Sequence, residues 1–188
     1  MRSNLFIFAT IFVLLTTQIG ATDPKTSCVN KFLKFFSTFF SSQQVGSYAD
    51  AAIGQVVKKA NSSDIVDAVL KTALKSLTTS QYAKGSSLIL SATSKFGSLA
   101  NINSTIQKCI NGAAPTLLKL YPKVTKKIQQ TNGDKTTTAY QFANKKFTLK
   151  LSKNLVKKCK SKLSNDEWSK GTSLLKSYIN FDVLGFSV

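Results

Sequence analysis

The sequence contains no histidine, and Glu167 is its only glutamate. A Ser–His–Asp or Cys–His nucleophile is therefore excluded. The three cysteines show no spacing typical of a metal site. Acid–base catalysis would depend on aspartate, lysine or tyrosine side chains with shifted pKa values. We therefore expect a protein that is not an enzyme, with no metal site and no cofactor.

Arginine is almost absent, since Arg2 is the only one. The other positive charges are 25 lysines, against eight acidic residues, and the net charge of the whole chain is +18. Lysine attracts anions as a point charge and lacks the planar fork that reads guanine or phosphate. We expect no specific nucleic-acid partner. An anionic membrane or a glycan surface is the candidate partner, and the alternative is a set of solvated helix faces that keep the protein soluble.

The positive charge is concentrated in the second half of the chain. Residues 109–188 carry 15 lysines and four acids, whereas residues 28–108 carry nine lysines and three acids. The candidate contacts for an anionic surface are Lys157, Lys158, Lys160 and Lys162, in a longer group with Lys145, Lys146, Lys150 and Lys153.

Long apolar runs are scarce, and the one that exists lies at the N-terminus. Arg2 precedes an apolar run over residues 5–15, and small residues follow at 19–21. This order is typical of a secretory signal, which we expect over residues 1–21. The run is shorter than the roughly 20 residues that span a bilayer. We therefore expect a secreted, extracellular protein.

Two sequons fit the secretory route. They begin at Asn61 and Asn103 and read Asn-Ser-Ser and Asn-Ser-Thr. Both are candidate N-glycosylation sites.

Three cysteines are an odd number, so at least one stays outside any intramolecular disulfide. A disulfide between Cys109 and Cys159 would tie two helices of the second half, and this pairing is slightly favoured. A Cys28–Cys109 disulfide would instead join the two halves. In a third interpretation, Cys159 is a small buried apolar residue without a disulfide.

The chain contains an internal repeat. Residues 77–89 read LTTSQYAKGSSLI and return without a gap at 163–175 as LSNDEWSKGTSLL, and residues 28–30 return at 109–111. This self-similarity predicts two copies of one unit of roughly 80 residues.

Each copy contains the signature of a helix–helix corner. Thr78 with Gln81, and Ser164 with Glu167, match capping boxes, in which a hydroxyl and the side chain three residues later satisfy two backbone amides. Gly85 and its counterpart Gly171 follow inside the next helix, where we expect them to permit close approach of another helix.

Apolar residues at helical spacing predict four helices per copy. In the first copy these cover residues 28–40, 48–60, 65–77 and 79 onward. In the second copy we expect Pro115 to lie in the first turn of a restarted helix. The Ser- and Asn-rich residues 92–104 predict the connector between the copies.

The predicted fold is all-α, with two tandem, pseudo-symmetric helical modules of about four helices each, residues 28–108 and 109–188. The chain is long enough to bury a core without many disulfides. We expect the modules to pack through their aromatic first helices.

Five phenylalanines give the first helix an unusually wide apolar face. They are Phe32, Phe35, Phe36, Phe39 and Phe40. Helical bundles often contain apolar cavities, so these are candidate contacts for a hydrophobic or lipid-like ligand. Alternatively, they form ordinary core or the interface between the copies.

In size, expected secretion and helix corners, the chain resembles the small, lysine-rich helical lipid carriers of nematodes, of the fatty-acid and retinol-binding type. This resemblance implies lipid binding and assigns no site residue. The first hypothesis is therefore a secreted, non-enzymatic binding protein. The alternatives are a cationic protein that acts on anionic bilayers in host defence, and an extracellular structural or interaction protein.

Overall fold

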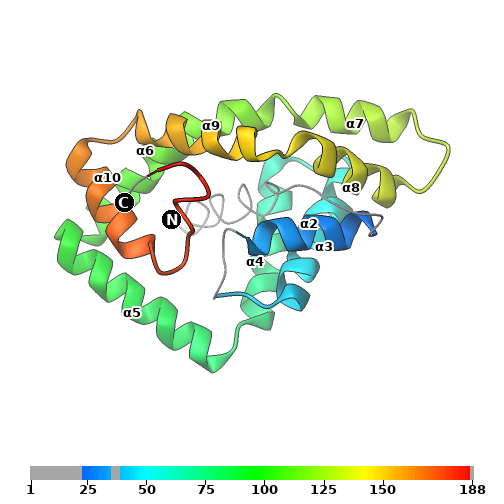
Figure 1. Cartoon of the computed structure of the whole chain (residues 1–188). Coiled ribbons are helices and arrows are strands. Elements are labelled where there is room, and N and C mark those ends of the chain that lie inside the picture. The colour runs from blue at the N-terminus through cyan, green and yellow to red at the C-terminus, as the bar shows by residue number, and fades with distance from the viewer. Residues whose placement is uncertain (1–22, 35–38, 187–188) are drawn as a thin grey trace.

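The computed structural model describes residues 23–34 and 39–186, and these residues form helices without strands (Figure 1). The predicted all-α fold is confirmed. The predicted secretory signal, residues 1–21, lies outside the described residues. The helices are α2 Pro24–Leu33, α3 Ser42–Val57, α4 Ser62–Ser76, α5 Thr79–Phe96, α6 Leu99–Leu118, α7 Tyr121–Gln129, α8 Lys135–Lys146, α9 Leu149–Lys160 and α10 Asn165–Leu175.

The residues expected to connect the two copies are mostly helical. The expected connector, residues 92–104, is helical except for a short break at Gly97 and Ser98. Gly97 ends α5 in the left-handed conformation that glycine favours, with φ of 79°, and Ser98 caps α6. The sequence boundary at residue 109 therefore falls inside one continuous helix.

Pro115 does not restart a helix in the second copy. Pro115 lies inside α6, which continues to Leu118. Pro122 instead occupies the first turn of α7, where a missing amide proton removes no helical hydrogen bond. The prediction for Pro115 was wrong because α6 begins well before Cys109, so its first turn lies elsewhere.

The two helix–helix corners form as predicted. Thr78 and Gln81 make a complete capping box at the start of α5, and Ser164 and Glu167 make one at the start of α10. In both copies, the aromatic residue after the box contacts the residue eight positions earlier. The Tyr82 hydroxyl donates to the carbonyl of Leu74 over 3.0 Å.

The equivalent contact in the second copy joins Lys160 and Trp168. Lys160 Nζ lies 5.3 Å from the centre of the Trp168 ring. The surroundings of the two aromatic rings otherwise differ, since Tyr82 is exposed whereas Trp168 packs against Phe181 and Phe186 of the C-terminal segment. The capping boxes are therefore alike in the two copies. The corners differ because the C-terminal segment packs on Trp168, whereas Tyr82 is exposed.

Helix packing is not equivalent in the two copies. In the first copy α4 packs mainly against α3, whereas its counterpart α9 packs against α6 (Figure 1). The modules were predicted to pack through their first helices. Instead, α2 of the first copy packs against α3 and α8. One buried cluster combines side chains of both copies, among them Val45, Ala139 and Leu155.

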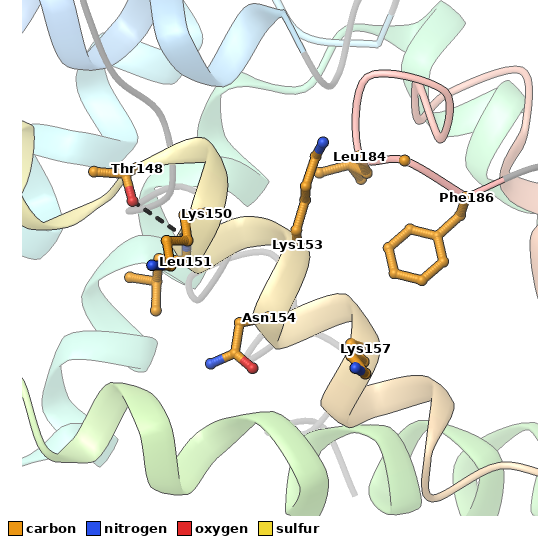
Figure 2. A pocket seen from close by; sticks show the side chains of 9 residues that line it. Thr148, Lys150, Leu151, Lys153, Asn154, Lys157, Leu184 and Phe186 are labelled. Carbon is orange, nitrogen blue, oxygen red and sulfur yellow. Dashed lines mark hydrogen bonds between the residues drawn. The ribbon is translucent and has the colours of Figure 1, made fainter.

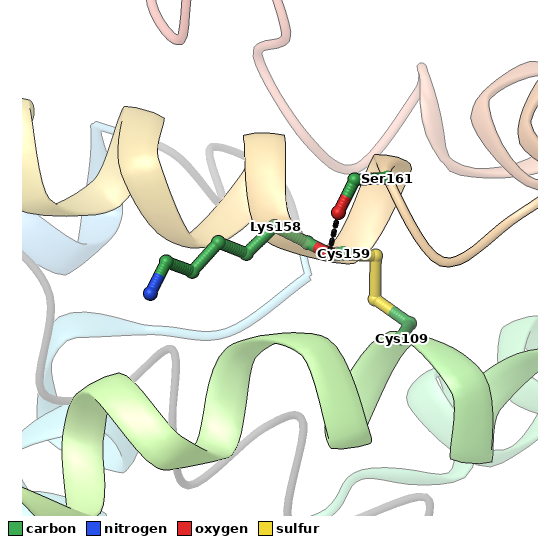
Figure 3. Close-up of a disulfide and its surroundings, with 4 residues drawn as sticks. All are labelled: Cys109, Lys158, Cys159 and Ser161. Carbon is green, nitrogen blue, oxygen red and sulfur yellow. Dashed lines mark hydrogen bonds between the residues drawn. A yellow bond between two sulfur atoms is a disulfide. The ribbon is translucent and has the colours of Figure 1, made fainter.

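A disulfide joins α6 to α9. Cys109 and Cys159 are bonded, with their Cα atoms 4.1 Å apart (Figure 3). One turn after Cys109, a Cβ atom at Gly112 would overlap the carbonyl oxygen of Lys158. Glycine therefore permits the close approach of these helices at Gly112. A Cβ atom at Gly85 or Gly171 would meet no atom of another described element within 4 Å, so the role predicted for those two glycines was wrong.

A polar cluster fastens α2 to α8. Lys31 is only 3% exposed, and its Nζ donates to Asn144 Oδ1 over 2.8 Å. The Cys28 thiol donates to the same oxygen over 3.2 Å, and Asn144 Nδ2 donates to the Pro24 carbonyl over 2.7 Å. Asn144 thus connects three residues of α2.

Candidate functional site

A pocket lies between α9 and the segment that follows α10 (Figure 2). Its volume is about 780 Å³, within the range of roughly 300–1,000 Å³ that is usual for small-molecule sites. The lining residues are Thr148, Lys150, Leu151, Lys153, Asn154 and Lys157 on or beside α9, and Leu184, Gly185 and Phe186 on the C-terminal segment.

The C-terminal wall is held in place by apolar packing. Ile179, Phe181 and Leu184 are buried in the core, so this irregular segment is anchored along its length. Gly185 has φ of 75°, and Lys153 Nζ lies 3.3 Å from the place where a Cβ atom would be. The glycine therefore allows both the turn and the close approach of the Lys153 side chain.

The α9 wall is positively charged. Lys150, Lys153 and Lys157 lie three and four residues apart on one side of the helix, over roughly 10 Å of its length. All three are exposed. Among the described residues, no acidic side chain lines the pocket, and none forms an ion pair with the three lysines. An anion in the pocket would therefore meet uncompensated charge.

Polar groups are available beside these lysines. Thr148 caps α9, and its hydroxyl oxygen accepts the amide of Leu151 over 3.2 Å, which leaves the hydroxyl proton able to donate. Asn154 also lines the pocket. On the opposite side the lining is apolar, with Leu184 and Phe186 across from α9 (Figure 2).

The four lysines of the predicted anionic contact do not act as one group. Of these, Lys157 lines the pocket. Lys158 Nζ donates to the Thr116 hydroxyl over 2.8 Å, and Lys160 lies over Trp168. Lys162 packs beside Gly112, beyond the end of α9. Helical rotation of about 100° per residue separates these neighbouring side chains.

The predicted phenylalanine cluster is described only in part. Phe35, Phe36 and the side chain of Phe32 lie outside the described residues. Phe39 and Phe40 are half-buried and pack edge to face, with ring centres 4.8 Å apart. Their further partners are Tyr178 for Phe39 and Tyr48 for Phe40, and neither phenylalanine lines the pocket.

The candidate glycosylation sites are both exposed. Asn61 caps α4, with its side-chain oxygen accepting the amide of Asp64, and Asn103 lies in the second turn of α6. The disulfide of Cys109 with Cys159 is one of the two pairings that the sequence left open.

Burial suppresses the reactivity of the remaining cysteine. Burial is the main cause that raises the pKa of the Cys28 thiol to about 11, and it lowers the pKa of the neighbouring Lys31. At neutral pH the thiol is protonated, and a thiol is a poor nucleophile.

Among residues 23–34 and 39–186, no group of three or more histidine, cysteine or acidic side chains could hold a metal ion. None of the helices described is both long and apolar enough to cross a membrane.

The family profile described as "Uncharacterized protein B0228.1-like" matches residues 5–174. The chain belongs to the B0228.1-like family. The match includes α9 with its three pocket lysines and stops before the C-terminal segment. No curated protein and no solved structure matches the chain significantly.

Several pocket residues were absent from the sequence prediction. Leu151 was assigned to a helix core, and Leu184 and Phe186 were not considered. One signal for the latter was present, because the apolar residues after position 178 follow no helical spacing and would need another element to cover them.

Proposed function

We propose that this chain is a secreted, non-enzymatic protein that binds a lipid-like anionic amphiphile between α9 and the C-terminal segment. One observation carries the proposal: a single pocket combines an apolar wall with a row of unpaired lysines. A ligand with an acid group and a hydrocarbon chain matches both walls.

The two walls support different parts of such a ligand. Leu151 and Phe186 are partly exposed and offer apolar surface, whose burial against a hydrocarbon chain is favourable. Lys150, Lys153 and Lys157 can donate charge-assisted hydrogen bonds to a carboxylate or phosphate. Binding without chemistry fits a chain that lacks histidine and whose Cys28 thiol is protonated.

The test is displacement of a dansyl-labelled fatty acid from the secreted, disulfide-bonded protein. Trp168 is the only tryptophan, and its ring centre lies 5.7 Å from that of Phe186, a pocket residue. Its intrinsic fluorescence therefore provides an independent readout. We expect saturable binding, and a shift of the Trp168 emission on addition of unlabelled fatty acid.

A matched pair of variants locates the site. Changing Lys150, Lys153 and Lys157 together to Gln should weaken fatty-acid binding about tenfold or more, since each lost charged hydrogen bond is worth about 1.5–3 kcal/mol. Changing Lys123, Lys126 and Lys127 of α7 to Gln removes the same charge outside the pocket and should leave the affinity within about twofold.

Two outcomes would overturn the proposal. One is the absence of saturable fatty-acid binding, and the other is equal loss of affinity in both triple variants. Leakage of anionic vesicles without saturable binding would instead favour the alternative of a membrane-disrupting protein.

A further inference from the structure

The lysines outside the pocket extend its charge over a larger surface. Residues 119–162, which cover α7, α8 and α9, contain 13 lysines and one acid, Asp134. Every one of these lysines is exposed, and none forms an ion pair with another described residue. Asp134 is already engaged, because its carboxylate caps α8. Figure 1 shows α7, α8 and α9 along one edge of the molecule.

Each element that lines the pocket carries an exposed apolar residue adjacent in sequence to a lining residue. Leu149 and Val183 are each 40% exposed. Leu149 lies between the pocket residues Thr148 and Lys150, and Val183 directly precedes the pocket residue Leu184. The two elements that line the pocket thus each carry an exposed apolar residue directly adjacent in sequence to a lining residue.

We propose that this mouth, formed by Leu149, Val183 and the pocket lysines, docks on an anionic phospholipid bilayer and exchanges the ligand while docked. The inference rests on the proposed function, because it assigns the partner from which the pocket would take or deliver its ligand. Docking requires no leakage, since only side chains at the mouth enter the headgroup region.

Charge and apolarity together favour a bilayer over other polyanions. Lysine-rich surfaces are attracted to anionic headgroups within about a Debye length. A sulfated glycan or a nucleic-acid backbone would satisfy the lysines equally well, but neither offers an apolar phase for Leu149 and Val183. A bilayer offers both, with the hydrocarbon immediately below the charged headgroups.

Direct exchange has a kinetic signature. If the ligand first leaves into water, its rate of transfer to vesicles is independent of vesicle concentration. If transfer occurs during contact, the rate rises in proportion to vesicle concentration, and salt slows it by screening the attraction.

The experiment follows transfer of an anthroyloxy-labelled fatty acid from the protein to vesicles by stopped-flow fluorescence. The vesicles contain either phosphatidylcholine alone or a mixture with phosphatidylserine. We expect the rate to rise with the concentration of the phosphatidylserine vesicles and to fall with added salt, with little dependence on neutral vesicles.

Matched variants test the mouth itself. Leu149→Ser with Val183→Ser should slow transfer to phosphatidylserine vesicles at least about fivefold, with unchanged ligand affinity. Leu90→Ser with Leu99→Ser removes two apolar residues that are more exposed, at 72% and 63%, on α5 and α6. This control pair should transfer at the original rate.

The possible failures can be told apart. A transfer rate that is independent of vesicle concentration, in a protein that still binds the fatty acid, overturns the docking proposal and leaves the proposed function intact. If no fatty acid binds, the proposed function fails, and co-sedimentation with phosphatidylserine vesicles then tests docking alone. Retention on heparin without such co-sedimentation would overturn docking in favour of a glycan partner.

Discussion

Gln44 and Gln81 bind each other through their side-chain amides. Gln44 Nε2 donates to Gln81 Oε1 over 2.8 Å, and Gln81 Nε2 donates to Gln44 Oε1 over 2.9 Å. Each glutamine is also the third residue of its helix and completes a capping box, at the start of α3 and of α5. Because Gln44 Nε2 donates to the Ser76 carbonyl as well, one amide pair joins the ends of three helices.

This pair predicts coupled losses of stability. Gln44→Ala and Gln81→Ala should each lower the free energy of unfolding by about 1–2 kcal/mol, since each removes a cap and a hydrogen bond. In a double-mutant cycle measured by urea unfolding, the coupling should exceed about 0.5 kcal/mol. Gln43→Ala, at an exposed neighbouring position, is the control and should change stability little. Strict additivity would show that the amide pair contributes nothing.

Replacement of glycine by alanine should change the stability of the protein in opposite directions at different positions. Gly112→Ala should destabilise the protein by about 1–3 kcal/mol, because the new methyl group overlaps the Lys158 carbonyl. Gly85→Ala and Gly171→Ala lie in helices with open space around them and should each stabilise it by about 0.5–1 kcal/mol. Thermal unfolding of the three variants measures the contrast. A stabilised Gly112→Ala variant would contradict the close approach of α6 and α9.

The disulfide predicts sensitivity to reduction. Cys109 and Cys159 are 50 residues apart, so loss of their bond should lower the free energy of unfolding by roughly 2–4 kcal/mol. Urea unfolding with and without dithiothreitol measures this difference. The Cys109→Ser, Cys159→Ser double variant should match the reduced protein and show no response to dithiothreitol. A large response in that variant would assign the effect to another group.

The lowered pKa of Glu167 should make the free energy of unfolding smaller in acid. Its hydrogen bond with Lys108, over 2.6 Å, and that from the Ser164 backbone lower the pKa of the carboxylate to about 2, from 4.5. Between these values the unfolded chain binds more protons than the folded chain. The stabilisation is therefore present above pH 4.5 and is lost as the pH falls towards 2.

Glu167→Gln tests this assignment with little structural change, because glutamine is the residue of the equivalent capping box, at Gln81. The variant should reduce the fall in unfolding free energy between pH 5 and pH 2, measured by urea unfolding. An unchanged pH dependence would mean that other carboxylates cause the acid effect.

Features that depend on a few neighbouring residues could be predicted from the sequence. The capping boxes at Thr78 and Ser164 form as expected, since each needs only a hydroxyl and a side chain three residues later. The box of Ser41 and Gln44 has the same pattern and was missed, although the sequence contains it. The all-α class follows from the same local signals, repeated along the chain.

Tertiary structure decided where these helices meet. Nothing local distinguishes Gly112, where an added Cβ atom would overlap α9, from Gly85, where an added Cβ atom would have open space among the described residues. Likewise, the burial of Lys31 depends on Asn144, more than a hundred residues away. The pocket joins α9 to Leu184 and Phe186 for the same reason. Helix formation is governed by hydrogen bonds within one or two turns, whereas the position of each helix results from many weak apolar contacts between distant residues, which only the folded chain brings together.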